Sequence, residues 1–502
     1  MVSRKVSGYF LSFLLLLHAQ SWSANSEQLP AYSRCLPEEL NDSNLLWRAD
    51  LWTNQYSIPT IHNGRIFLAT NDVGLKHHTL KGSGGGLVTC LDAKTSSMIW
   101  QLVIPRFVKE DHPPYFFDQW RCGVCSRPII DGDRLYVVGS RGDILCLDAN
   151  GLHNGNDGPF QDEAKYISEG KLPDLKLAPT DGDIIWRFDM LSQAAVYPHD
   201  VCGSTVLIVG DLLYVCTSNG VDATHAKATN PQAPSLIVLD KHTGRLIAKD
   251  DEKIGQRLYH CLWSSPASGI LDGKTIIFFG GGDGILYAFE PPTYSPGSTD
   301  VQTLRKLWQY DCNPPDYRLR DGKPLRYSGF QDKYTDGPSE IIATPVFYRD
   351  RVYVAIGQSP IDGPGKGMLS CIDAHTGTSV WTSKLVDRTL STAAIADDLL
   401  YVCDFSGNLH CFDANTGHRY WVHELGSNVW SASPFVADGK VYIGTENRDF
   451  WILAAAKDKT VLSKAAVDSM PLTITAADGV LYLPTQRYLY AYRCPQPSPT
   501  AQ

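Results

Sequence analysis

The sequence Leu409-His-Cys-Phe-Asp-Ala-Asn-Thr-Gly-His-Arg-Tyr-Trp421 is nearly repeated by Leu369-Ser-Cys-Ile-Asp-Ala-His-Thr-Gly-Thr-Ser-Val-Trp381. Weaker copies run over residues 88–100, 144–151 and 236–244. A unit repeated along a chain buries its apolar face only against neighbouring units. The repeat therefore predicts an array of similar small modules.

Each copy of this phrase follows a short apolar run, as at residues 133–139, 211–216 and 398–403. β-Branched and aromatic runs bounded by Gly and Asp are typical of strands joined by tight turns. A further run that begins at Pro or a small residue lies upstream, as at 126–130 and 343–347. The phrase itself supplies a third strand, a Thr-Gly turn and a fourth strand with the Trp. One unit is thus a four-stranded antiparallel meander.

Eight such units can be counted. Their second strands centre on Phe67, Tyr136, Tyr214, Phe278, Tyr353, Tyr401, Tyr442 and Tyr482. The last unit ends at 488–492 without a fourth strand, whereas an unassigned Trp strand lies near the other terminus at 45–49. If this strand completes the last unit, the ring closes and no sheet edge is exposed. We therefore expect an all-β chain, a single eight-bladed β-propeller over 45–494, closed by an N-terminal strand that completes the last blade.

The Asp-Ala-x-Thr-Gly-x-x-x-Trp phrase, at 373–381 and 413–421, resembles the repeat of the PQQ-like, or quinoprotein, β-propellers. That family includes PQQ-dependent alcohol dehydrogenases and bacterial outer-membrane assembly propeller lipoproteins. The resemblance covers nearly all of the chain beyond its first residues and implies the propeller fold. It leaves the activity open, because the Trp of the phrase packs between blades and a fold does not define a function.

The composition limits the class of partner. The net charge is −9 and no basic stripe is visible, which argues against nucleic acid. Aromatic residues make up 11% of the chain, as suits an all-β globular protein. We expect a monomer that binds a protein or a small molecule.

The N-terminus has the pattern of a secretory signal peptide over 1–23, with an apolar run at 9–17 that is too short to span a bilayer. A lead segment over 24–44 and a disordered tail over 495–502 complete the predicted organisation. Cys35 follows Tyr-Ser-Arg, which is not a lipid-attachment motif. The expected location is periplasmic or secreted, without a transmembrane segment.

The chain contains 13 cysteines, an odd number that excludes complete intramolecular pairing. Four share one position of the repeat and are expected to be buried as small hydrophobic residues: Cys90, Cys146, Cys371 and Cys411. Cys35 and Cys494 flank the two strands that would close the ring. A disulfide clasp between them is an attractive hypothesis.

Insertions identify the face expected to carry function. Loops between second and third strands, and those between blades, emerge on the same face of a propeller. Five insertions fall there, at 72–85, 104–119, 221–234, 311–339 and 358–367. Two insertions, 151–181 and 291–304, fall on the opposite face. Long loops on a rigid scaffold commonly bind ligands, so the face with five insertions, here called the padded face, is predicted to be functional.

The segments before the first strands open onto the same face around the central channel. They carry residues that the repeat does not need. The ligand-binding candidates are Trp120, Arg121, His199, Asp200, His260, Trp263, Arg388 and Trp430. Aromatic, imidazole and guanidinium groups around a channel mouth suit a planar, anionic or carbohydrate-like ligand. The alternative is that they plug the channel and satisfy its backbone groups.

Cys122 and Cys125 form a CxxC pair and are the redox candidates. Ser126 follows the pair, which excludes covalent attachment of a c-type haem. The pair precedes a strand rather than a helix, so a structural disulfide or two free thiols are the alternatives. A soft-metal site built from Cys122, Cys202, His199 and His260 is a further hypothesis.

The insertion at 151–181 is rich in oxygen ligands. Its metal candidates are Asn154, Asn156, Asp157, Asp162 and Glu163. Calcium prefers such loops, although the spacing departs from that of an EF-hand. The alternative is an Asx-rich turn.

Taken together, these patterns favour a secreted or periplasmic scaffold that binds a ligand or protein through its padded face. The alternative is a quinoprotein-type oxidoreductase acting on alcohols or sugars with PQQ as cofactor. The resemblance implies an adjacent Cys-Cys disulfide over that ring in the dehydrogenases, and this chain has no Cys-Cys dipeptide. A third hypothesis is a polysaccharide-binding or lyase-like protein.

Overall fold

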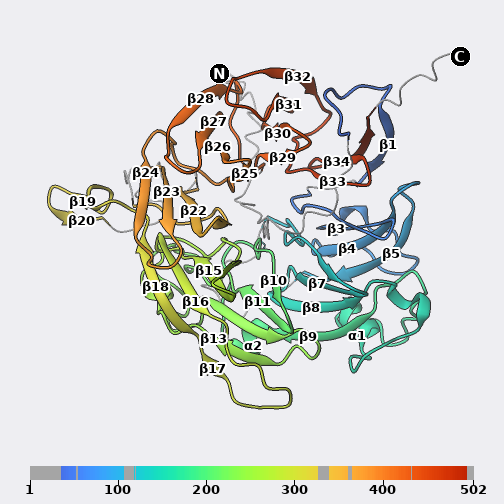
Figure 1. The fold of residues 1–502 in the computed structure, drawn as a ribbon. Coiled ribbons are helices and arrows are strands. Elements are labelled where there is room, and N and C mark those ends of the chain that lie inside the picture. The colour runs from blue at the N-terminus through green and yellow to red at the C-terminus, as the bar shows by residue number, and fades with distance from the viewer. Residues whose placement is uncertain are drawn as a thin grey trace, which may run out of the picture.

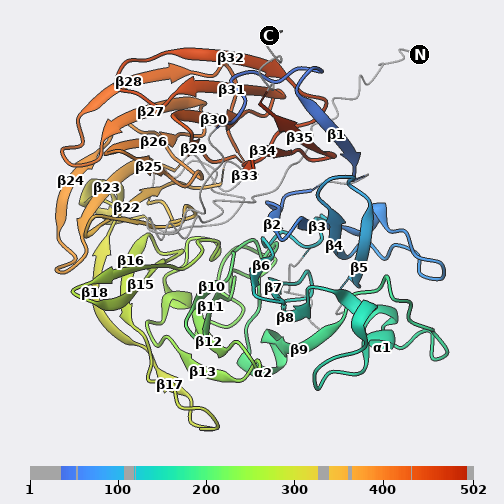
Figure 2. The same cartoon turned by 45° about the vertical axis from the view of Figure 1, so that its right-hand side comes forward.

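Eight small antiparallel sheets surround a central axis in the computed structural model (Figures 1 and 2). The structure describes residues 35–51, 55–106, 118, 120–325, 338–359, 365–430 and 432–494. The prediction of a single eight-bladed propeller is confirmed. The expected signal peptide, the first part of the lead segment and the C-terminal tail lie outside the described residues.

Each blade is a four-stranded meander whose first strand is innermost. Blade 1 contains β2 (Thr60–His62), β3 (Arg65–Asn71), β4 (Gly86–Asp92) and β5 (Met98–Ile104). Blade 2 contains β6 (Ile129–Asp131), β7 (Arg134–Val138), β8 (Asp143–Asp148) and β9 (Ile184–Asp189). Blade 3 contains β10 (Leu207–Val209), β11 (Leu212–Cys216), β12 (Leu236–Asp240) and β13 (Leu246–Lys249). Blade 4 contains β14 (Ala267–Leu271), β15 (Lys274–Gly280), β16 (Ile285–Glu290) and β18 (Arg305–Asp311).

The second half of the ring follows the same order. Blade 5 contains β21 (Val346–Tyr348), β22 (Arg351–Ile356), β23 (Met368–Asp373) and β24 (Ser379–Ser383). Blade 6 contains β25 (Ala394–Ala396), β26 (Leu399–Cys403), β27 (Asn408–Asp413) and β28 (Arg419–Glu424). Blade 7 contains β29 (Phe435–Ala437), β30 (Lys440–Gly444), β31 (Asp449–Ala454) and β32 (Val461–Ala466). Blade 8 contains β33 (Thr475–Ala477), β34 (Val480–Pro484), β35 (Tyr488–Arg493) and β1 (Leu45–Asp50).

The remaining elements decorate this ring. β17 (Gln302–Thr303) adds a parallel strand to β13, and β19 (Leu319–Arg320) pairs with β20 (Lys323–Pro324) in a projecting hairpin (Figure 1). The helices are α1 (Glu163–Ser168), α2 (Met190–Ala194) and the 3₁₀ turns Asp72–Gly74, Gly151–Asn154, Ile254–Gln256 and Pro315–Tyr317. None of the helices in the described ranges has the length and apolar character needed to cross a membrane.

The repeated phrase builds a turn and a seam between blades. In blade 6 the Asp413 carboxylate accepts hydrogen bonds from the backbone N–H groups of Asn415 and Thr416, at 2.9 and 3.0 Å. This local bonding fixes the turn that leads to Gly417, whose φ is +72°. A Cβ atom at Gly417 would lie 2.7 Å from the Trp381 ring of the preceding blade. The Thr-Gly turn therefore provides the flat surface on which that tryptophan packs.

Tryptophans also hydrogen-bond across the blade boundaries. Each indole N–H donates to a backbone carbonyl just after the third strand of the next blade. The pairs are Trp47 with Ala93, Trp100 with Ala149, Trp186 with Lys241, Trp308 with Ala374, Trp381 with Ala414 and Trp421 with Ala456. The phrase is repeated because it joins each unit to its neighbour, and apolar layers fill the space between the sheets.

Two glycines with similar backbone conformations allow the effect of this contact between blades to be distinguished from the effect of backbone strain. Gly439 has a φ of +67°, close to that of Gly417, but a Cβ there would have no neighbour within 4 Å. We expect Gly439→Ala to lower the free energy of unfolding by about 1 kcal/mol. Gly417→Ala should cost roughly 1–3 kcal/mol more, because its Cβ meets the Trp381 ring. Urea unfolding of both variants measures the difference, and equal losses would contradict the proposed role of the turn.

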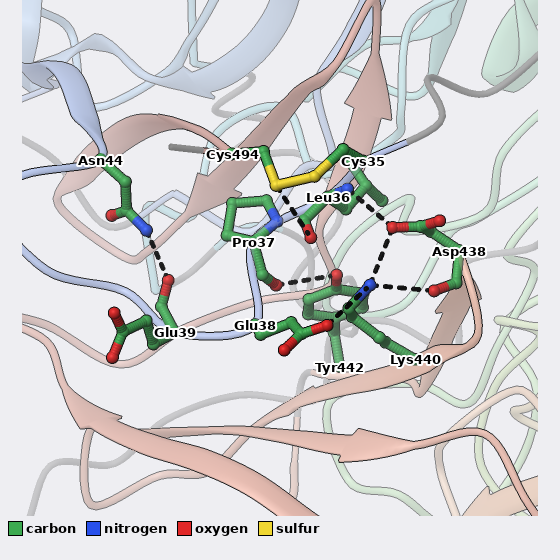
Figure 3. The surroundings of a disulfide bond; sticks show 10 residues. All are labelled: Cys35, Leu36, Pro37, Glu38, Glu39, Asn44, Asp438, Lys440, Tyr442 and Cys494. Atoms are coloured by element: carbon green, nitrogen blue, oxygen red, sulfur yellow. Dashed lines mark hydrogen bonds and ion pairs between the residues drawn. A yellow bond between two sulfur atoms is a disulfide. The ribbon is translucent and has the colours of Figure 1, made fainter. Parts of the chain in front are cut away.

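The ring closes as expected. β1 pairs antiparallel with β35, so the N-terminal strand is the fourth strand of blade 8. The predicted clasp is confirmed, because Cys35 and Cys494 form a disulfide with their Cα atoms 5.9 Å apart (Figure 3). The other eleven cysteines are free and buried, as predicted for those at the repeated strand position.

The described end of the lead segment also contacts blade 7. The Leu36 N–H donates to the Asp438 carboxylate at 2.8 Å, and the Tyr442 hydroxyl donates to the Pro37 carbonyl at 3.0 Å (Figure 3). Lys440 forms an ion pair with Asp438 at 2.8 Å. The segment thus fastens the N-terminus across the boundary between the last two blades.

Candidate functional site

The chain order places the insertions as predicted. Residues 72–85 join β3 to β4 and residues 221–234 join β11 to β12, both second-to-third-strand loops. Insertion 151–181 joins β8 to β9, so it opens on the opposite face. The described parts of the other insertions on the padded face likewise follow a second or a fourth strand. The topology therefore supports one densely decorated face.

The segments before the first strands fill the middle of the ring. One buried cluster brings together residues from blades 4 to 7: Cys261, Trp263, Ile342, Ala343, Leu390, Phe405 and Trp430. A second buried cluster contains Tyr56, Cys122, Cys125, Val201, Met470 and Leu472. The centre of the molecule is thus packed with side chains, and Trp263 and Trp430 belong to that packing as the plug alternative expected.

Three buried histidines meet beside this central packing. His199 precedes β10, His260 precedes β14, and His225 lies on the loop between β11 and β12. The His199 and His225 Nε2 atoms are 3.2 Å apart. The ring centroids of His199 and His260 are 4.6 Å apart, and the rings of His225 and His260 are nearly parallel at 5.3 Å. One nitrogen from each of the three rings lies within 4.8 Å of the others.

We call His199, His225 and His260 the tri-histidine cluster, and one backbone residue, Val221, holds two of its members. The Val221 carbonyl accepts a 2.6 Å hydrogen bond from His199 Nδ1, and the Val221 N–H donates to the His260 carbonyl at 3.0 Å. A Cβ atom at Gly220 would lie 2.4 Å from the His199 Cβ. Gly220 is therefore needed for the close approach of these segments.

Burial controls the charge of the cluster. It lowers the pKa of His199 to about 3, with His225 as the next cause, and it also lowers the pKa of His225. Burial, followed by the other two rings, lowers the pKa of His260 well below its ordinary value. All three imidazoles are thus neutral at pH 7. The Asp200 carboxylate lies 3.6 Å from His199 Nε2 and adds an anionic oxygen to the site.

The candidates of blades 6 and 7 form a separate stack. The Arg388 guanidinium lies 4.6 Å from the centroid of the Phe405 ring, which contacts Trp430 edge to face at 5.7 Å. Burial lowers the pKa of Arg388. Trp430 also lines a cavity of about 380 Å³ with Glu446, Arg448, Asp468, Ser469, Met470 and Gln486. This cavity, here called the blade 7–8 cavity, lies on the padded face, because all of its lining residues follow a second or a fourth strand.

Trp120 and Arg121 lie apart from the histidines. The Trp120 side chain is 41% exposed, and the Arg121 side chain packs near Gly84 at the rim. Among the candidates, His199, Asp200, His260 and Trp263 converge, and the Trp263 ring lies 4.9 Å from that of His260.

Sequence reasoning missed His225. A histidine within an unusually long second-to-third-strand loop was the only signal that pointed to it.

Cys122 and Cys125 are buried beside Tyr56 and are not joined to each other by a disulfide. Burial is the main cause that raises the pKa of Cys125 well above its ordinary value, which suppresses the reactive thiolate. Cys202 is also buried, and burial raises its pKa. The clustered histidine ligands contain His225 rather than these thiols, so the structure assembles a different metal-ligand set from the Cys–His set considered above.

A compact acidic cluster lies at the base of the oxygen-rich insertion. Carboxylate oxygens of Asp148, Asp157 and Asp183 lie within 4.8 Å of one another. Burial, then nearby carboxylates led by Glu163, raises the pKa of Asp183 to about 6. Two other candidates support the loop by hydrogen bonds, from Asn156 to the Glu163 carboxylate and from Asn154 to that of Asp157. Asp162 is exposed and makes no capping hydrogen bond from its side chain.

The described residues around the tri-histidine cluster do not match PQQ. A planar tricarboxylate needs cationic partners and a flat slot. The Asp200 carboxylate lies 3.6 Å from His199 Nε2, and the buried Glu340 accepts a hydrogen bond through Oε2 from the N–H of Cys261, the residue after His260. The described disulfide lies at the ring closure between Cys35 and Cys494, far along the chain from these segments.

Comparison with known proteins supports the fold. The family model described as outer membrane protein assembly factor BamB matches residues 39–154 and 365–485. This match supports a PQQ-like β-propeller fold. No curated protein is similar enough in sequence to count as a match.

Solved structures agree with this PQQ-like architecture. BamB from Moraxella catarrhalis is 14% identical, with a TM-score of 0.52 over 90% of this chain and 98% of that one. Sqt1 from Saccharomyces cerevisiae is 9% identical, with a TM-score of 0.54 over 90% and 99%. A europium-containing methanol dehydrogenase is 14% identical, with a TM-score of 0.49 over 89% and 86%. At these identities the likeness concerns the fold alone.

Proposed function

We propose that this protein is an extracytoplasmic binding scaffold whose padded face holds a ligand with both polar groups and an apolar surface, such as a saccharide or a peptide segment. The observation that carries the proposal is the blade 7–8 cavity. It opens where the surrounding loops are shortest, beside the packed centre of the ring.

The chemistry of the lining supports this ligand class. The cavity offers one guanidinium, two carboxylates, an amide and a hydroxyl beside the Trp430 indole and a methionine. Burial raises the pKa of Glu446, which places a protonatable group in the lining. Arg448 adopts a φ of +73°, a left-handed conformation that is costly for a residue with a side chain and that clusters at functional sites.

Two further observations support an extracytoplasmic scaffold. The Cys35–Cys494 disulfide is of the kind that persists in oxidising compartments. The BamB match connects the chain with a family described as an assembly factor, which favours binding over catalysis. A protein partner is therefore as suitable for this face as a free saccharide.

Binding measurements on Trp430→Ala test the proposal. We expect the full-length mature protein to bind members of a glycan array or a random-peptide array. Trp430→Ala should weaken the selected interaction at least about 10-fold, because aromatic anchors dominate such sites. Trp120→Ala, an exposed tryptophan on the same face, is the matched control and should change affinity less than about 2-fold. An unchanged affinity in Trp430→Ala, or no binding to either array, would contradict the proposal.

The same preparation separates the scaffold from the oxidoreductase alternative. Titration with PQQ and calcium, followed by quinone absorbance, should give no saturable one-to-one complex, because the charged group beside the tri-histidine cluster is the Asp200 carboxylate, which would repel the carboxylates of PQQ. Saturable binding would favour the quinoprotein alternative and direct a search for alcohol or sugar substrates.

A further inference from the structure

We propose that His199, His225 and His260 form a binding site for a first-row divalent transition-metal ion, with zinc as the preferred occupant. The site lies in blades 3 and 4, whereas the proposed ligand cavity lies between blades 7 and 8. The inference therefore goes beyond the scaffold function, and either proposal can fail without the other.

The spacing of the ring nitrogens suits such an ion. Zinc bound to imidazole at 2.0–2.1 Å in a tetrahedron places its nitrogen ligands about 3.3 Å apart. His199 and His225 already present Nε2 atoms 3.2 Å apart. The nitrogen of the third ring lies within 4.8 Å of them, a separation that small rotations of the side chains would close. A hydrogen bond between two imidazoles explains one short contact, but it does not explain why His260 completes a triangle.

The orientation of His199 is set as it is for a metal ligand. Its Nδ1 lies 2.6 Å from the Val221 carbonyl, an acceptor, so Nδ1 carries the proton and Nε2 carries the lone pair. Metal-bound histidines commonly use their second nitrogen in this way, which fixes both tautomer and ring direction. The Val221 N–H meanwhile holds the backbone of His260. One residue, Val221, thus positions two of the three proposed ligands.

The donor set selects the class of ion. Three imidazoles suit zinc, copper, nickel, cobalt and iron, whereas calcium and magnesium prefer oxygen ligands. The Asp200 carboxylate, 3.6 Å from His199 Nε2, provides an oxygen for a fourth position. The three histidines and Asp200 are almost entirely buried, so the ion would be enclosed by protein.

Cobalt absorption tests this site directly. Full-length mature protein dialysed against EDTA should bind one equivalent of Co²⁺ and develop the visible absorption of a four-coordinate ion, and one equivalent of Zn²⁺ should displace it. His225→Gln should raise the dissociation constant for zinc at least about 100-fold. The control is His78→Gln, which changes an exposed histidine stacked on His77 and should alter zinc affinity less than about 2-fold.

A measurement on the unmodified protein guards against a variant that does not fold. Zinc-edge X-ray absorption of the one-to-one complex should show scattering from three imidazole ligands, with Zn–N distances of about 2.0 Å. Less than half an equivalent of bound metal, a spectrum without imidazole, or zinc affinity unchanged in folded His225→Gln would each overturn the proposal.

We also infer that the acidic cluster at the base of the 151–181 insertion binds one calcium ion. Asp148, Asp157 and Asp183 converge on one point, and Glu163 acts electrostatically on Asp183. Asp183 and Glu163 are fully buried. Among the described residues, Asp183 Oδ1 and Glu163 Oε1 have no hydrogen-bond partner. Buried carboxylates that pack together in this way are compensated either by a counter-charge or by a proton.

The neighbouring protein groups provide too little of that compensation. Arg134 forms an ion pair with Asp148 at 2.7 Å, and the Asp157 N–H donates to Asp183 at 3.0 Å. Within the described part of the chain, the four carboxylates therefore have one cationic partner, Arg134. Calcium accepts several carboxylate oxygens at once, so it matches both the charge and the two oxygens without hydrogen bonds.

Calcium titration tests this second site separately from zinc. Calorimetry of the EDTA-dialysed full-length mature protein should detect one calcium ion per chain, and calcium should also raise the thermal unfolding midpoint. Asp183→Asn should raise the dissociation constant at least about 10-fold, whereas exposed Asp162→Asn should change it less than about 2-fold. Absence of both heat and stabilisation in the unmodified protein, or equal affinity in the two folded variants, would contradict the inference.

Discussion

Trp100→Ala should remove about 3–5 kcal/mol from the free energy of unfolding. The Trp100 side chain is fully buried between blades 1 and 2, and its indole N–H donates to the Ala149 carbonyl at 2.8 Å. Its ring also covers Gly151, where a Cβ would lie 2.7 Å from the ring. Alanine would leave a cavity at a seam on which both blades depend. Urea unfolding followed by far-ultraviolet circular dichroism measures the loss.

Two further variants separate the contributions at this seam. Trp100→Phe keeps an aromatic ring and loses the indole hydrogen bond, so it should cost less, about 1–2 kcal/mol. Trp451→Ala removes a half-buried tryptophan of a third strand and should cost no more than about 2 kcal/mol. If Trp451→Ala destabilises the protein as much as Trp100→Ala, the seam has no special role.

The fold could be predicted because the seam is encoded locally. Asp413, Gly417 and Trp421 lie within nine residues, and each is required by a contact that recurs in other blades. The unpaired strands at the two ends then specified closure, since only β1 could complete the sheet that ends at β35. In a closed ring, a motif repeated along the sequence therefore also predicts contacts between strands that are far apart in the chain.

The candidate site depends on contacts that no local pattern records. His199 and His260 could be predicted because each lies just before a first strand, at a position where the repeat requires no histidine. His225 lies in a long loop, and it meets the other two only because Val221 of the same loop bonds to His199 and His260. Trp120 and Arg121 were expected at the channel, but Cys122 and Cys125 take the buried positions there. Asp183 was overlooked because it precedes a strand far from the oxygen-rich stretch.

The clasp at the ring closure should provide the other large effect on stability. Replacing Cys35 and Cys494 together by Ser is expected to lower the free energy of unfolding by about 2–5 kcal/mol. The disulfide links residues 459 positions apart, so it restricts almost the whole unfolded chain. It also holds the segment in which Leu36 is fully buried against blade 7. Urea unfolding of the double variant and the unmodified protein measures the difference.

Reduction supplies the internal control for this prediction. Dithiothreitol should bring the unmodified protein to the stability of the double variant and should leave the double variant unchanged, because the remaining cysteines are already free. An unchanged unfolding midpoint in the double variant would mean that pairing of β1 with β35 closes the ring without help. A further loss on adding reductant to the double variant would mean that another cysteine pair, rather than the clasp, responds to reduction.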